Sequence, residues 1–133
     1  MTARTTLDAV AMAQIIGDRD NQEDVLASHA IGPNAGVHSG ERLLILADGM
    51  GGHAGGEVAS RLVVESFADA YVNSQSKIHD VLRSSLDSAN EQLTQAVAET
   101  ARLRGMATTI IGCVVSDNQL YWISVGDSDF ELV

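Results

Sequence analysis

Acidic residues stand at three points where short apolar segments begin or end. Glu23 and Asp24 close the polar stretch GDRDNQED (residues 17–24), Asp48 follows the apolar run LLILA, and Asp127 comes soon after LYWISV. If these points converge in the fold, their carboxylates repel one another unless a cation lies between them. Carboxylate and carbonyl oxygens are the ligands of hard ions such as Mg²⁺ and Mn²⁺. The pattern therefore indicates a divalent metal site.

Five glycines follow Asp48 within eight positions, in the stretch GMGGHAGG (residues 49–56). A glycine at position 49 lets a backbone carbonyl approach a metal without interference from a side chain. Gly49, Gly51 and Ala54 also fit the G-x-G-x-x-A spacing of a dinucleotide-binding loop. That reading is disfavoured because Asp48 would repel the pyrophosphate. An acid followed by glycine also occurs in plain turns and helix caps, so this structural alternative stays open.

Other metal chemistries fit the sequence less well. A calcium loop of the D-x-[DN]-x-[DN]-G type would need glycine where Glu23 stands. Zinc is disfavoured because the histidines lack paired ligand spacing. They are His29, His38, His53 and His79. The single cysteine, Cys113, lies in an apolar run and is expected to be buried and inert.

Composition narrows the class of protein. The length of 133 residues suits one domain, and a hydrophobic content of 45% argues against disorder. The formal net charge of −10 argues against nucleic-acid binding, which needs a clustered basic patch. No run is long and apolar enough for a signal peptide or a membrane span. We therefore expect a cytoplasmic protein without nucleic-acid or membrane partners.

Strands and helices that could bring the acids together follow from periodicity. Apolar residues at three- and four-residue spacing predict helices over 57–71 and 77–101, the second with Ser76 as N-cap. Alternating or β-branched segments predict strands over 10–16, 25–30, 42–47, 108–116 and 120–125. Consecutive helices and a hairpin turn at DNQ predict an α+β fold with an antiparallel sheet. The apolar ending at Val133 reads as the start of another strand, so we expect the domain to be truncated there.

Four motifs in order resemble those of the metal-dependent protein phosphatases of type 2C, the PPM family, in their bacterial form. They are GDRDNQED, LADGMGGHAGGEVAS, RGMATTIIGCVV and LYWISVGDSDFEL, and together they cover residues 17–132. The resemblance implies an α-β-β-α four-layer sandwich, in which two antiparallel sheets are flanked by helix pairs. Residues 1–133 would form a single domain, the N-terminal half to two-thirds of the catalytic domain.

The resemblance also implies roles for individual residues. Asp48 would bridge two metals, Gly49 would offer its carbonyl, and Arg19 would grip the substrate phosphate. Asp48 and Arg19 would thus be the catalytic pair. The full set of expected metal-binding residues is Asp48, Gly49, Glu23, Asp24 and Asp127. Thr108 and Thr109 are expected to brace the metal loop, and His53 is either a proton donor to the leaving group or a loop residue that faces solvent.

The implied activity is hydrolysis of phosphoserine or phosphothreonine by a metal-activated water, with two or three Mn²⁺ or Mg²⁺ ions in the complete domain. The implied partners are phosphoproteins, including a serine/threonine kinase or its substrates. Asp129 stands where the family has arginine, and the family's D-G and D-N aspartates are absent. We therefore expect an inactive or weakly active fragment. The alternative is a natural non-catalytic module that binds phosphoproteins.

Overall fold

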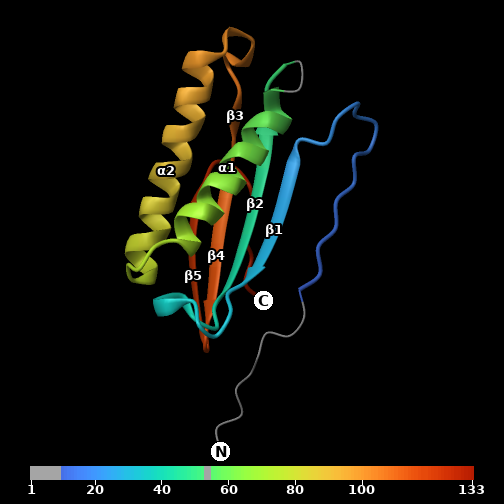
Figure 1. The fold of residues 1–133 in the computed structure, drawn as a ribbon. Coiled ribbons are helices and arrows are strands. Elements are labelled where there is room, and N and C mark those ends of the chain that lie inside the picture. The colour runs from blue at the N-terminus through green and yellow to red at the C-terminus, as the bar shows by residue number, and fades with distance from the viewer. Residues whose placement is uncertain (1–9, 53–54) are drawn as a thin grey trace, which may run out of the picture.

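Two helices cover one face of an antiparallel sheet in the computed structural model, which describes residues 10–52 and 55–133 (Figure 1). The strands are β1 (Asp24–Ala30), β2 (Arg42–Met50), β3 (Ala107–Thr108), β4 (Ile110–Ser116) and β5 (Gln119–Val125). The helices are α1 (Gly55–Val72) and α2 (Ile78–Glu99). This arrangement confirms the α+β class predicted from the sequence. None of the helices described is long and apolar enough to cross a membrane.

The sheet has the strand order β1-β2-β4-β5, and short β3 pairs with the end of β2. Every pairing is antiparallel, and the register places Asp24 opposite Asp48. The β4–β5 hairpin closes with Ser116 opposite Gln119. Asp117 in the turn has a φ of 51°, a left-handed conformation that aspartate tolerates. The predicted turn at DNQ is therefore confirmed.

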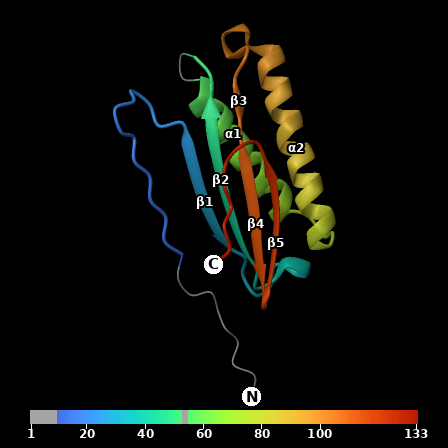
Figure 2. The same cartoon turned by 180° about the vertical axis from the view of Figure 1, so that it is seen from behind.

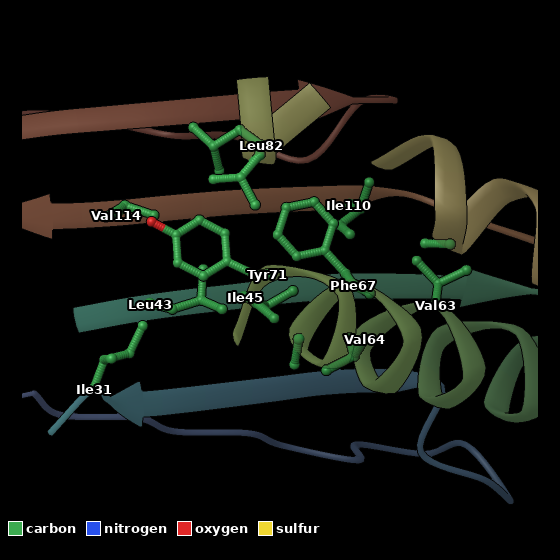
Figure 3. Packing of buried hydrophobic residues seen from close by; sticks show 14 residues of the cluster. Ile31, Leu43, Ile45, Val63, Val64, Phe67, Tyr71, Leu82, Ile110 and Val114 are labelled. Atoms are coloured by element: carbon green, nitrogen blue, oxygen red, sulfur yellow. The ribbon is translucent and has the colours of Figure 1, made fainter. Parts of the chain in front are cut away.

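The core lies between the sheet and the two helices. Alternate residues of β2, among them Leu43 and Ile45, are buried against the helices. Phe67 and Tyr71, four residues apart on α1, fill the space above them, as Figure 3 shows. Phe67 packs so closely on β4 that a Cβ on Gly112 would lie 2.6 Å from its ring. The apolar spacing read from the sequence thus marks the buried face of α1 correctly.

The opposite face of the sheet has no helix over it among the described residues. Leu44 and Leu46 of β2 alternate with the buried residues, so they point to this face and remain half-buried. The segment that follows β5 crosses back over the same face (Figure 2). Phe130 of that segment stacks on Trp122 with ring centroids 5.5 Å apart, and Trp122 remains 56% exposed. We refer to this side of the sheet as the open face.

Three local predictions were wrong. Residues 10–16 form no strand, and this stretch instead meets the sheet through the Gln14 side chain, which donates to the Asp24 carbonyl at 2.9 Å. Residues 129–133 also form no strand, because Phe130 turns onto Trp122. Alternation shows that a segment can form a strand, but not whether it pairs with a neighbouring strand.

The predicted N-cap of the second helix was also wrong. Lys77 occupies the N-cap position of α2, without a side-chain capping bond. The backbone N–H of Ser76 instead donates to the Ser74 hydroxyl at 3.1 Å. The Ser74 side chain therefore stabilises the turn before the helix, and α2 begins at Ile78.

Candidate functional site

An open hollow lies where the end of β2 meets the segment before β1 and the loop after β5. Arg19 and three of the predicted metal-site acids reach it. The lining residues are Arg19, Asp20, Asn21, Glu23, Asp48, Gly49, Met50 and Asp127. Segments far apart in the sequence therefore meet here, which is the condition for the metal site predicted from the sequence.

Asp24 and Asp48 form a carboxyl pair at this end of the sheet. They are register partners on β1 and β2, and directly opposite residues place their side chains on the same face, with Cβ atoms about 4.5–5.5 Å apart. Partial burial raises the pKa of Asp48 first, and a hydrogen bond with Asp24 and its negative charge raise it further. Arg19 opposes this shift, whereas Asp127 adds to it. The site thus concentrates negative charge that a cation or a proton must offset.

Glu23 connects the hollow to α1. Its Oε2 lies 3.9 Å from Nη1 of Arg19, whose side chain is 71% exposed. A Cβ built on Gly56 would lie 2.6 Å from Oε1 of Glu23, so the carboxylate packs on the first turn of α1. The N-terminal end of a helix attracts negative charge, which favours this placement. Arg19 is therefore held only by a long contact, and most of its side chain is exposed.

Gly49 lies where β2 passes directly under α1. A Cβ at this position would overlap the Gly56 carbonyl group, so no other residue type fits. Its N–H donates to the Glu23 carbonyl at 3.1 Å. The glycine therefore joins β2, α1 and the segment that carries Glu23 at a single point.

The threonines after Gly105 hold the backbone of Asp48, as the sequence predicted. The Thr108 hydroxyl donates to the Asp48 carbonyl at 3.1 Å. The Thr109 hydroxyl accepts a hydrogen bond from the Asp48 N–H at 3.0 Å. Asp48 is therefore fixed by its main chain while its side chain remains exposed.

The acids do not form a closed metal cage by themselves. Across residues 10–52 and 55–133, no three His, Cys, Asp or Glu side chains gather closely enough to hold a metal ion. Asp129, although exposed, is not part of the lining. His53 lies outside the described residues, as does Ala54. The hollow therefore offers one wall of oxygen donors.

A buried polar cluster far from the hollow was not predicted from the sequence. Oε2 of Glu41 accepts hydrogen bonds from the Tyr71 hydroxyl at 2.6 Å and from Nδ1 of His38 at 2.9 Å. These three side chains come from the loop before β2 and the end of α1. No motif linked them, because their partnership depends on the packing of α1 over the sheet. Ser128, which bonds to Thr109 beside the hollow, was also missed, because that bond depends on how the loop after β5 folds back.

Comparisons with known proteins agree with this geometry. The family profile described as Protein phosphatase 2C matches residues 17–133. The serine/threonine protein phosphatase PstP of Mycobacterium tuberculosis is 41% identical over 96 residues, which make up 69% of this chain and 18% of that protein. Protein phosphatase PhpP of Streptococcus pneumoniae is 33% identical over 99 residues, 71% of this chain and 40% of that protein.

Solved structures show the same likeness. The catalytic domain of PstP in complex with 2 manganese ions superposes with a TM-score of 0.66 at 34% identity, over 82% of this chain and 43% of that one. The phosphatase Stp1 from Staphylococcus aureus gives a TM-score of 0.70 at 30% identity, over 82% and 42% of the two chains. The chain thus spans less than half of the length of these relatives.

Proposed function

The chain belongs to the protein phosphatase 2C family, and we propose that it supplies one wall of the active site of a metal-dependent serine/threonine protein phosphatase. The observation that carries this proposal is the pairing of Asp24 with Asp48 across two strands, since Asp48 lines the hollow together with Arg19 and Asp127. Clustered acids suit divalent cations, and an arginine beside them suits a phosphate. A site for phosphate monoester hydrolysis needs both.

The donor chemistry of the hollow fits Mn²⁺ or Mg²⁺. All of the groups concerned are hard oxygen donors, and burial, together with the charges of Asp24 and Asp127, raises the pKa of Asp48, whose ionised form a cation would stabilise. The residues proposed to hold the ions are Asp48, Gly49, Glu23, Asp24 and Asp127. Bound divalent ions lower the pKa of water and neutralise phosphoryl oxygens, which is the chemistry this reaction requires. The manganese complex of PstP supports this choice of metal for the family.

Arg19 is the positively charged side chain in the lining of the hollow. Its guanidinium can donate two parallel hydrogen bonds to a phosphate, and it stays charged at any physiological pH. The contact with Glu23 at 3.9 Å is too long to hold it firmly. We therefore assign to Arg19 the binding and orientation of the phosphoryl group.

By itself, this chain is expected to have little phosphatase activity and to bind manganese weakly. Its acids form one wall, and the solved relatives are more than twice as long as the matched part. The open face, with Trp122 exposed, is the surface on which the second sheet of a four-layer sandwich would pack. Phosphoproteins, including a kinase or its substrates, are the proposed partners, and the cytoplasm is the proposed location.

A chimera tests this proposal directly. Residues 17–133 of this chain would replace the matching segment of PstP, whose remaining residues complete the catalytic domain. We expect Mn²⁺-dependent hydrolysis of p-nitrophenyl phosphate and of a phosphothreonine peptide. Asp48→Asn should lower kcat by about a thousandfold, since metal catalysis contributes several kcal/mol. Glu91→Gln, on the exposed side of α2, serves as the matched control.

The outcome separates the two candidate functions. A folded chimera that hydrolyses neither substrate, although PstP does under the same conditions, would overturn the proposed catalytic role. If that chimera still bound the phosphopeptide through Arg19, the non-catalytic module would be favoured instead.

A further inference from the structure

Thr109 lies between the end of β2 and the loop that follows β5, and only 3% of it is exposed. Its hydroxyl accepts a hydrogen bond from the Asp48 N–H at 3.0 Å. Its own N–H donates to the Asp48 carbonyl at 2.9 Å. Two hydrogen bonds between one pair of residues therefore fasten Asp48 to Thr109.

The same hydroxyl reaches the loop that carries Asp127. Oγ1 of Thr109 lies 2.6 Å from Oγ of Ser128, and either group can be the donor. A hydroxyl group has one proton and two lone pairs, so Oγ1 can serve Asp48 and Ser128 at once. A chain of two hydrogen bonds thus runs from the Asp48 amide to the neighbour of Asp127.

Gly126 completes the contact on the other side of Asp127. Its φ of +101° lies in the region that favours glycine. A Cβ at Gly126 would lie 2.7 Å from Cγ2 of Thr109, so the loop sits directly on the threonine methyl group. Thr109 therefore holds the loop by its hydroxyl at Ser128 and by its methyl at Gly126.

We propose that Thr109 is a positioning residue that keeps the loop bearing Asp127 in place relative to Asp48. The consequence for metal binding rests on the proposed function, whereas the consequence for loop order does not. Thr108 offers a natural comparison, since its hydroxyl also bonds to the Asp48 backbone. Its recorded bonds go to Asp48 and Thr109 rather than to the loop.

Nuclear magnetic resonance relaxation on the whole chain without metal tests the proposal first. Thr109→Val keeps the shape and removes the hydroxyl, whereas Thr109→Ser keeps the hydroxyl. In Thr109→Val the order parameters of residues 126–128 should fall from about 0.85 towards 0.6. Thr108→Val should leave them unchanged, and Thr109→Ser, which loses only the methyl contact, should lower them less than Thr109→Val. A loop that stays equally ordered in folded Thr109→Val would overturn the proposal.

Manganese supplies the second measurement. Paramagnetic broadening of the Asp48 and Asp127 amide signals gives the Mn²⁺ concentration at half effect. Thr109→Val should need about tenfold more Mn²⁺ than Thr109→Ser, because the loop that bears Asp127 is no longer held in place. Equal midpoints would contradict the claimed effect on metal binding. If even the unaltered chain shows no broadening, the metal site fails, and the loop measurement alone decides the role of Thr109.

A second variant covers the case in which Thr109→Val does not fold. Gly126→Ala leaves the Thr109 hydroxyl intact but pushes the loop away from the methyl group. It should raise the mobility of residues 127–128 in the same way. A folded Gly126→Ala with an unchanged loop would count against the proposal.

Discussion

Asp24 and Asp48 lie directly opposite each other on the neighbouring strands β1 and β2, so their carboxyl groups face the same side of the sheet. The register of β1 on β2 creates this pair. A slip of one residue would move every side chain of the strand to the other face. Burial and the neighbouring charge of Asp24 raise the pKa of Asp48, so the pair supports the metal proposal and has a cost in stability when no metal is bound.

Replacement of Asp48 by asparagine should therefore stabilise the metal-free chain at neutral pH. Because the folded state raises the pKa of Asp48, the acid favours folding below its unfolded pKa and loses this contribution as pH rises through the folded value. Asp48→Asn should gain up to about 1 kcal/mol at pH 7, because charges near the surface are well screened. Below about pH 4, where the unfolded carboxyl is protonated too, the gain should vanish. Urea unfolding in the presence of a chelator measures the unfolding free energy of both proteins at the two pH values.

Glu91→Gln provides the control for that experiment, since it is the same kind of change on the exposed side of α2. A loss of stability in metal-free Asp48→Asn at pH 7 would mean that the carboxyl pair is not strained by charge.

Alanine at position 49 should disrupt the junction of β2 and α1. The added Cβ would overlap the Gly56 carbonyl group, which belongs to the backbone and cannot move aside freely. We expect a loss of about 1–3 kcal/mol of unfolding free energy, as for other overpacked sites. Gly52→Ala is the matched control, because no atom lies within 4 Å of a Cβ built there. Equal effects of the two changes would contradict the close contact of strand and helix.

Arg19→Lys should weaken phosphate recognition in the PstP chimera. Lysine keeps the positive charge but loses the planar fork that binds two phosphate oxygens. We expect kcat/KM for a phosphothreonine peptide to fall about tenfold, the loss of roughly one charged hydrogen bond. Arg61→Lys is the control, because Arg61 pairs with Glu57 on the surface of α1 at 2.7 Å. A chimera insensitive to Arg19→Lys would place phosphate binding elsewhere.

The buried cluster of His38, Glu41 and Tyr71 predicts that the folded chain loses stability at alkaline pH. Burial, together with the hydrogen bond to Glu41, raises the pKa of Tyr71. The folded chain thus holds a proton that the unfolded chain releases near pH 10, so stability should fall above that pH. Tyr71→Phe should lose about 1–3 kcal/mol at pH 7, because Glu41 loses a partner, and should show a flatter alkaline decline.

The comparison variant for this prediction is Tyr121→Phe, since the Tyr121 hydroxyl bonds to Gln119 at an exposed position. A pH profile of Tyr71→Phe with the same alkaline slope as the unaltered chain would exclude Tyr71 as its origin.

Local sequence patterns were sufficient for the helices and most of the sheet. The 3.6-residue repeat marked Phe67 and Tyr71, and Asp48 followed by Gly49 marked the strand end where the hollow lies. The strand predicted over residues 10–16 was wrong because alternation does not show whether a segment pairs with a neighbouring strand. The strand predicted after β5 was also wrong, because Phe130 in that segment stacks on Trp122 of the open face.

The candidate site was predictable in its acids but not in its supports. Spacing to strand ends marked Glu23, Asp48 and Asp127, which line the hollow, whereas Asp24 lies beside Asp48 outside the lining. The bond from Thr109 to Ser128 spans 19 positions and depends on how the loop after β5 folds back. The cluster of Glu41 and Tyr71 spans 30 positions and depends on helix packing. Such contacts produce no periodic pattern in the sequence.

The position of bound manganese tests the central claim most directly. Crystals of the PstP chimera grown with Mn²⁺ and measured at the manganese absorption edge would locate each ion by its anomalous signal. We predict a peak about 2.0–2.2 Å from a carboxylate oxygen of Asp48, with Asp24 or Glu23 beside it directly or through water. The peak should disappear in Asp48→Asn. Manganese bound elsewhere, with no peak in contact with Asp48, would contradict the account.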